Sequence, residues 1–137
     1  MLKLVKKISF YVLLLQINLA MAAAPTFLLT HNQTDVESNA YIDGTIPSIY
    51  PTKPHSDSKV YWNMVRVACH GHTANNICTA LIKMASNTPN PIDVGYVNLD
   101  LTTGEITPKV ISNNGYTLTV NGPGETTLTK AIQSPKS

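Results

Sequence analysis

The chain has 137 residues, a mass of 14.9 kDa and a formal net charge of +2, with 43% hydrophobic and 13% charged residues. This balance excludes a collagen, a coiled coil and a fully disordered chain, and the length allows one domain. Self-similarity at a fixed period is not visible, which argues against a solenoid or a propeller. We therefore expect a single domain.

The first 22 residues have the pattern of a secretory signal peptide. Three lysines precede an apolar run over residues 8–20, and Ala20-Met21-Ala22 supplies a small-x-small cleavage site. The run holds about 13 residues, which is short for a helix that must cross roughly 30 Å of hydrocarbon, so an uncleaved anchor is the weaker alternative. We place the start of the mature chain at Ala23. No cysteine stands at this point to suggest a lipid-anchored N-terminus.

Removal of this segment changes the sign of the net charge. Ten basic residues less three lysines leave seven, against eight acidic residues, so the mature net charge is about −1 with neutral histidines. The one arginine, Arg66, and six scattered lysines form no basic cluster. We therefore expect no nucleic-acid partner and, after cleavage, no stable membrane anchor.

The mature sequence, residues 23–137, is punctuated by Asn, Gly, Pro, Ser and Thr at short intervals. This pattern predicts an all-β fold, a small antiparallel β-sandwich of about six to eight short strands. Residues 26–31 and 40–42 are the first candidate strands, and the second ends at a turn-forming Asp-Gly pair. Residues 47–59 contain three prolines, which lack the amide hydrogen that a central strand needs, so they predict a surface loop or an extended edge segment.

The strongest strand prediction falls on residues 60–69, which are rich in β-branched and aromatic side chains. Both faces of this strand would be mixed and largely apolar, so we place it centrally in a sheet. Residues 77–85 are ambiguous. Apolar residues there recur at helical spacing, with Thr73 as a candidate N-cap, and they also alternate as in a strand. We prefer the strand.

Two hairpins are predicted in the last third of the chain. Residues 92–101 and 105–111 flank Thr102-Thr103-Gly104, and residues 116–120 and 125–131 flank Asn121-Gly122-Pro123-Gly124. The candidate core residues of these strands are Val94, Tyr96, Val97, Leu99, Leu101, Leu118, Val120 and Leu128. Residues 132–137 are expected to form a frayed tail.

The two cysteines predict a disulfide bond between Cys69 and Cys78. An exported protein usually meets an oxidising compartment, and an even cysteine count favours a bridge there. Closing a loop of about ten residues would stabilise the fold by roughly 2.7 kcal/mol in the chain-entropy model. We expect the bridge to join the end of the strongest strand to the element that follows it.

A metal site is the alternative for the same segment. Imidazole and thiolate are ligands of zinc and copper, and His70 and His72 can point the same way from an extended backbone, with Met64 nearby. The cysteine spacing matches none of the common short zinc spacings, and an oxidised pair offers no thiolate. We therefore predict no cofactor and exposed loop histidines, and keep copper or zinc on His70 and His72 as the alternative.

No catalytic motif is assembled in the sequence. It has no G-x-S-x-G elbow, no H-E-x-x-H helix and no phosphate-binding glycine loop. Asp93, Asp100 and Glu105 become an acidic pair only if folding brings two of them together. We predict no catalytic residues and keep a small secreted hydrolase as a second alternative.

Aromatic side chains are the candidate ligand contacts. Tyr50 stands among prolines in an extended segment, which favours an exposed contact. Trp62 is the other candidate contact, although for this residue a place in the core is favoured. Asn32-Gln33-Thr34 matches a glycosylation acceptor.

A resemblance to known proteins is carried by three segments, Asn90–Tyr96, Thr103–Pro108 and Asn121–Glu125. With them the chain, from about Phe27 to Lys130, resembles the small exported, mostly uncharacterised β-rich proteins of intracellular-living gammaproteobacteria. The resemblance implies a bacterial exported protein and transfers no catalytic residue. We predict a periplasmic or secreted binding module that contacts a protein or glycan partner through its loops.

Overall fold

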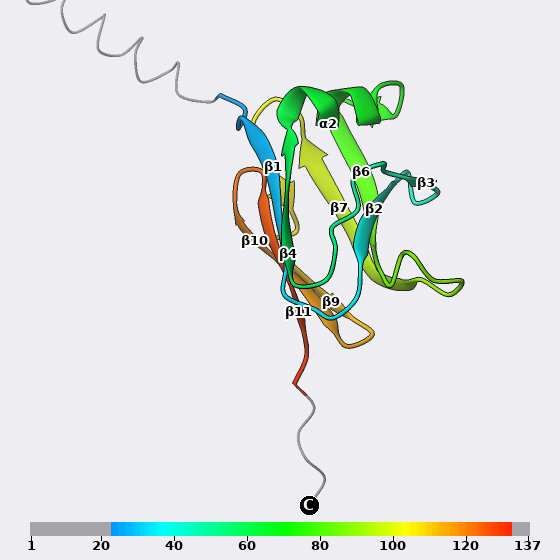
Figure 1. Cartoon of the computed structure of the whole chain (residues 1–137). Helices are drawn as coiled ribbons and strands as arrows, with labels where there is room; N and C mark the ends of the chain where they lie inside the picture. Colours follow the sequence, from blue (N-terminus) through cyan, green and yellow to red (C-terminus); the bar gives the residue numbers. More distant parts are fainter. Residues whose placement is uncertain (1–22, 133–137) are drawn as a thin grey trace, which may run out of the picture.

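The computed structural model describes residues 23–132, and in this range two β-sheets pack face to face with one helix at an end of the sandwich (Figure 1). The all-β sandwich predicted from the sequence is confirmed. The predicted signal peptide, residues 1–22, and residues 133–137 of the predicted tail lie outside the described residues. In the described part of the chain no helix is long and apolar enough to cross a membrane.

The first sheet, which we call sheet A, has the strand order β4-β1-β11-β10-β9. Its strands are β1 (Phe27–Asn32), β4 (Ser56–Tyr61), β9 (Val110–Asn113), β10 (Tyr116–Gly122) and β11 (Glu125–Lys130). Neighbouring strands are antiparallel except β1 and β11, which pair in parallel. The first and last strands of the described chain therefore lie side by side within sheet A.

The second sheet, sheet B, has the order β3-β2-β6-β7-β8, with β5 paired to β6, and all its pairs are antiparallel. Its strands are β2 (Ser38–Ile42), β3 (Ile46–Pro47), β5 (Thr73–Ala74), β6 (Ile77–Met84), β7 (Ile92–Asp100) and β8 (Ile106–Thr107). Strand β6 confirms the strand preferred over a helix for residues 77–85, apart from Ala85, which lies beyond its end.

The strand predicted over Val60–Cys69 is wrong for most of its length. Strand β4 ends at Tyr61, and Trp62–Cys69 form helix α2. The buried residues of this helix are Trp62, Val65 and Cys69, which recur at helical spacing. Burying this face against the sandwich outweighs the strand preference of the β-branched and aromatic residues, because intrinsic propensity is weaker than tertiary packing.

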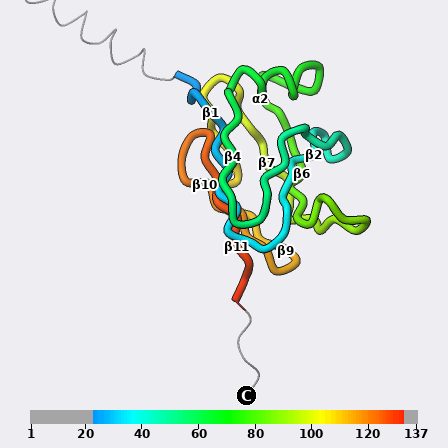
Figure 2. The backbone as a smooth tube through the Cα atoms, in the orientation of Figure 1, coloured from blue at the N-terminus to red at the C-terminus, as the bar shows by residue number. Residues whose placement is uncertain are grey.

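The proline-containing segment predicted over residues 47–59 is a loop only over its middle part, and most of that part is exposed. Pro47 belongs to β3 and residues 56–59 belong to β4. The connection between them, residues 48–55, runs along the edge of the sandwich between β2 and β4, and we call it the strap (Figure 2). Ser38 and Thr52 exchange backbone hydrogen bonds of 2.9 and 2.8 Å. This pairing is available because Thr52, unlike the strap prolines, keeps its amide hydrogen.

Of the two predicted hairpins, one forms as expected and one forms in part. Strands β10 and β11 pair as predicted, with an irregularity between Val120 and Gly122. Strand β7 pairs with β8, but β8 ends at Thr107, and the rest of the predicted partner lies in β9 of the other sheet. Pro108, which follows Thr107, has no amide hydrogen to continue the ladder.

The core lies between the sheets and beneath α2. Among the predicted core residues, Val94, Val97, Leu101, Leu118 and Leu128 are buried, and Leu99 and Val120 are half-buried. Tyr96 is 54% exposed, so its assignment to the core is wrong. The register of β6 and β7 shifts between Ile82 and Lys83, and such a bulge changes which residues of β7 face inward.

Candidate functional site

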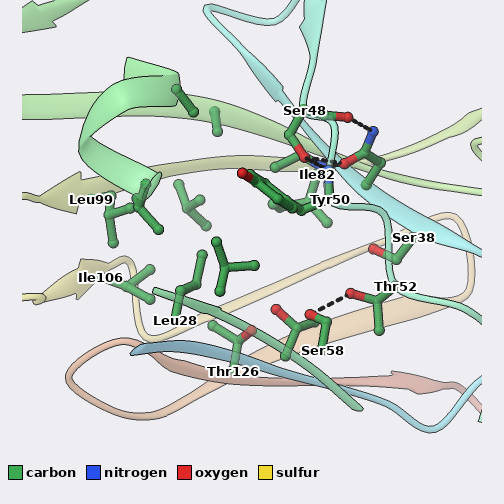
Figure 3. Close-up of a pocket in the computed structure, with 18 of the residues that line it drawn as sticks. Leu28, Ser38, Ser48, Tyr50, Thr52, Ser58, Ile82, Leu99, Ile106 and Thr126 are labelled. Atoms are coloured by element: carbon green, nitrogen blue, oxygen red, sulfur yellow. Dashed lines mark hydrogen bonds between the residues drawn. The ribbon is translucent and has the colours of Figure 1, made fainter. Parts of the chain in front are cut away.

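A cavity of about 120 Å³ lies between the two sheets, beside the strap (Figure 3). Its walls include small inward-facing side chains from both sheets, among them Ala40, Ala80, Thr30 and Ser58. In a closely packed sandwich, larger aliphatic side chains from the two inner faces interdigitate and fill such space. The cavity therefore follows from the choice of small residues at inward positions.

A row of hydroxyl side chains on sheet A forms one wall. In the strand register Thr30 of β1 lies opposite both Ser58 of β4 and Thr126 of β11, so all three point into the sandwich. Thr52 Oγ1 donates to Ser58 Oγ at 2.9 Å. Within residues 23–132 the hydroxyls of Thr30 and Thr126 have no hydrogen-bond partner. In that range every fully enclosed side-chain oxygen or nitrogen has a hydrogen-bond partner. The hydroxyls of Thr30 and Thr126 lack one, so they are not fully enclosed and reach open space in the cavity.

Polar side chains fasten the strap at both ends. Ser48 Oγ donates to Asn39 Oδ1 at 2.6 Å, and Asn39 Nδ2 donates to the Ser48 backbone oxygen at 2.8 Å. At the other end, Asn32 Nδ2 donates to the backbone oxygens of Thr52 and Lys53, each at 3.2 Å. The strap is thus held as a fixed wall of the cavity rather than as a free surface loop.

Tyr50 projects from the strap into the cavity between these two attachments (Figure 3). Its ring is half-buried and packs against the core. The sequence predicts an exposed contact residue at this position. The structure instead makes Tyr50 a lining residue, and its hydroxyl has no hydrogen-bond partner in the described part of the chain.

The two ends of the cavity differ in polarity. Ser38, Thr52 and Ser58 gather at one end, which we call the hydroxyl end, and Leu99 and Ile106 lie at the other, the apolar end (Figure 3). None of the described residues that line the cavity is Asp, Glu, Lys, Arg or His. The site therefore offers hydroxyl groups and apolar surface, but no charge.

The predicted Cys69–Cys78 disulfide is present and contributes to the cavity wall. Both cysteines are 1% exposed, and their Cα atoms are 6.0 Å apart. The bridge joins the last residue of α2 to β6, whereas the sequence predicts that it joins the end of a strand to the element that follows. It fixes the helix against sheet B beside the lining residues Val65 and Ala68.

The histidines proposed as metal ligands lie apart from the cavity. His72 Nδ1 is 2.7 Å from Asp43 Oδ2, and His70 is an exposed residue that follows α2. Both sulfur atoms nearby are taken up by the disulfide. Within residues 23–132 no group of three His, Cys, Asp or Glu side chains is arranged to hold a metal ion. The pairing of His72 with Asp43 was not anticipated from the sequence.

A further histidine that the sequence did not single out lies between two carboxylates. His31 Nδ1 is 2.8 Å from Asp57 Oδ1, and His31 Nε2 is 2.8 Å from Glu125 Oε2. The hydrogen bond to Asp57, and then that to Glu125, raises the pKa of His31 above its usual 6.5. Since Thr30 next to it points inward, His31 lies on the outer face of sheet A and cannot act on a ligand in the cavity.

Two other residues singled out in the sequence are buried, and for Trp62 this confirms the favoured place in the core. Trp62, a candidate ligand contact, is 4% exposed, and its Nε1 donates to the Leu101 backbone oxygen at 3.0 Å, so it belongs to the core. Asn32, the candidate glycosylation acceptor, is 2% exposed, with its side-chain amide bonded to backbone oxygens. The sequon is therefore enclosed in the folded protein.

The acidic residues considered for hydrolysis make other interactions. Asp93 Oδ1 lies 3.5 Å from Lys83 Nζ. Asp100 Oδ1 accepts backbone hydrogen bonds at the turn after β7, and Glu105 Oε1 lies 3.5 Å from Lys109 Nζ. None of these carboxylates lines the cavity. The arrangement suits binding of a small apolar molecule more than acid–base chemistry.

Comparison with known proteins finds relatives of this chain. A family model described as "T2SS substrate NttC" matches residues 1–131. Among solved structures, the chain is similar to the crystal structure of the Legionella pneumophila type II secretion system substrate NttC, with 64% identity and a TM-score of 0.77. That match covers 78% of this chain and 99% of the Legionella chain. A search of curated proteins finds no match.

Proposed function

The chain belongs to the NttC family of type II secretion substrates, and from this premise we propose that it is a non-catalytic binding module whose ligand occupies the cavity between its sheets. Membership of the family makes it a secreted bacterial protein. The binding function is supported by the cavity itself, with its apolar walls and its unpaired inward hydroxyls. We propose that it acts outside the cytoplasm.

The energetics of the cavity support a ligand. Residual cavity volume destabilises a protein by about 24 cal/mol per Å³, so a cavity of about 120 Å³ corresponds to roughly 3 kcal/mol. That is a large share of the stability of a small domain, which is commonly about 5–15 kcal/mol. A molecule that fills the space regains part of these contacts and stabilises the folded state by mass action.

The cavity also changes the kind of ligand that we expect. From the sequence alone, a protein or glycan bound through the loops is expected. A protein segment or a glycan carries many polar groups, and burying them between apolar walls is unfavourable unless each one is hydrogen-bonded. The walls formed by residues such as Ile82, Val97 and Leu99 instead suit a small, mainly apolar molecule.

Titration of the secreted protein with naphthalene, a neutral probe of ten carbons, tests this function. We expect the amide NMR signals of Ala80 and Thr126 to shift and the melting temperature to rise. The substitution Ala80→Leu fills the cavity and should abolish both effects, with Ala40→Val as a second filling variant if Ala80→Leu does not fold. The matched control, Ala74→Leu, lies on exposed β5 and should bind normally. Unchanged spectra, or equal binding by a folded filling variant, would contradict the proposed function.

A further inference from the structure

We infer that the ligand of this cavity is an uncharged amphiphile, with a flexible alkyl chain at the apolar end and an alcohol-type group at the hydroxyl end. This inference rests on the function proposed above and specifies the chemical class of its ligand. Charge, hydrogen-bonding capacity and shape each support a different part of it.

The absence of charge in the cavity wall argues against an anionic ligand. The residues that line it carry hydroxyl, amide, sulfur and hydrocarbon groups, and none of these described residues is Asp, Glu, Lys, Arg or His. A carboxylate placed there would lose its hydration without gaining a cation, which is strongly unfavourable. The protonated form of His31 lies on the outer face of sheet A, where it is engaged by Asp57 and Glu125. A neutral head group avoids this penalty.

The unpaired hydroxyls argue for a ligand that forms hydrogen bonds. Ser38 is 4% exposed and Thr126 is 6% exposed, and both line the cavity without a side-chain hydrogen-bond partner among the described residues. A hydroxyl group both donates and accepts, so a ligand alcohol can satisfy such a group in either direction. A hydrocarbon ligand would shield these hydroxyls from water without giving them a partner, which is costly, so it would leave part of the site unmatched.

The shape of the cavity argues for a chain. Ile82, Ala80 and Cys78 all line it, so it follows β6 over four residue steps, or about 13 Å. A volume of about 120 Å³ spread over that length leaves a narrow cross-section. By comparison with an apolar cavity of about 150 Å³ that holds benzene, the volume accepts roughly six non-hydrogen atoms. A single extended alkyl chain fits the narrow cross-section, and the part of a longer chain that the cavity does not accept continues through its open side.

Three probes with ten carbons each test the chemical class of the ligand independently of whether the site binds any ligand. They are decan-1-ol, decanoate and naphthalene, titrated by NMR into the secreted protein at pH 8, where decanoate is ionised. We expect decan-1-ol to bind at least tenfold more tightly than decanoate, and more tightly than naphthalene.

Two substitutions in the hydroxyl row of sheet A, one on β11 and one on β1, test the hydrogen bond to the ligand. Thr126→Val keeps the shape of the inward side chain and removes its hydroxyl, so we expect it to weaken decan-1-ol binding by about 3- to 10-fold and to leave naphthalene unchanged. If Thr126→Val does not fold, Thr30→Val is used in its place, since it removes the neighbouring hydroxyl of the same row. The control Thr129→Val lies on the outer face of the same strand and should change neither affinity.

The outcomes distinguish the inference about the ligand class from the proposed binding function. The inference about the ligand class is overturned if decanoate binds as tightly as decan-1-ol. It is also overturned if Thr126→Val weakens the binding of decan-1-ol and of naphthalene equally. Binding of naphthalene alone overturns that inference and leaves the binding function in place. If none of the three probes binds, both proposals fail.

Discussion

The side-chain amide of Asn32 donates a hydrogen bond to the backbone oxygen of Thr52 at 3.2 Å, which ties the end of β1 to the C-terminal half of the strap. The same amide also donates to the backbone oxygens of Lys53 at 3.2 Å and Val36 at 2.8 Å. Asn32 Oδ1 accepts from the Thr34 backbone amide at 3.0 Å. One buried side chain therefore holds both connections that lead out of β1 and into β4.

The substitution Asn32→Ala should be strongly destabilising. It removes the donor of three backbone oxygens in a buried environment, so we expect the free energy of unfolding to fall by about 2–4 kcal/mol. Urea unfolding measures the change. The control Gln33→Ala alters the exposed neighbouring residue and should change stability by less than about 0.5 kcal/mol. Equal stability of the two variants would show that the strap is held by other contacts.

Loss of the disulfide should destabilise the fold without changing its topology. Cys69 and Cys78 close a loop with a sequence separation of 9, for which the chain-entropy model gives about 2.7 kcal/mol. We expect Cys69→Ala combined with Cys78→Ala to unfold at a correspondingly lower urea concentration. Wild-type protein kept reduced is the comparison, since it loses the bridge but keeps both cysteine side chains. A double variant as stable as the oxidised protein would contradict this prediction.

His31 should make stability depend on pH above neutrality. Hydrogen bonds to Asp57 and Glu125 raise the pKa of His31 in the folded state, so protonated His31 stabilises the fold. This contribution is fully present below the unfolded pKa of about 6.5 and is lost as the pH rises through the higher folded pKa. We expect the difference in unfolding free energy between wild type and His31→Gln to decrease from pH 6 to pH 9.

The measurement for His31 is a series of urea unfolding curves on both proteins at matched ionic strength, because exposed charges are screened by salt. His55→Gln, which alters an exposed histidine outside this cluster, is the matched control and should leave the pH profile unchanged. A wild-type advantage over His31→Gln that stays constant or grows with pH would contradict the assignment.

Gly124 should tolerate no side chain, whereas Gly115 should tolerate one at a modest cost. Both have positive φ, +65° at Gly124 and +87° at Gly115. A Cβ on Gly124 would lie 2.8 Å from Pro25 Cγ and 2.9 Å from the Phe27 backbone oxygen, while a Cβ on Gly115 meets nothing within 4 Å. We expect Gly115→Ala to cost about 1 kcal/mol from its backbone conformation and Gly124→Ala to cost clearly more. Thermal melting of the two variants compares them, and equal melting temperatures would show that the contact with Pro25 is easily relieved.

Local sequence signals predicted much of the fold but not the helix. The strands that flank the Asn121–Gly124 turn carry a direct hairpin signal, because glycine adopts without strain the positive φ that a tight turn requires. In contrast, Trp62, Val65 and Cys69 fit a helix only once they pack on the end of the sandwich, and in isolation their neighbours favour a strand. Whether this segment forms a helix or a strand is determined by tertiary packing, which a single sequence does not reveal.

The candidate site was harder to predict for the same reason. Thr30, Ser58 and Thr126 are far apart in the sequence, and only the pairing of β4, β1 and β11 brings their hydroxyls into one row. The pairing of strands depends on contacts between distant segments, which alternation within one strand cannot specify. The prolines around Tyr50 did identify an extended segment, but its burial depends on the bond between Ser38 and Thr52.

The parallel pairing of β1 with β11 has a consequence for how this chain reaches its folded form. Synthesis delivers the N-terminal strand first and β11 last, so β1 lacks a neighbour on one side until almost the whole chain has emerged. Contacts of such large sequence separation slow folding, because the intervening chain must be closed first. A protein built in this way is expected to complete sheet A only at the end of synthesis, and a truncation before Glu125 would remove an interior strand rather than an edge.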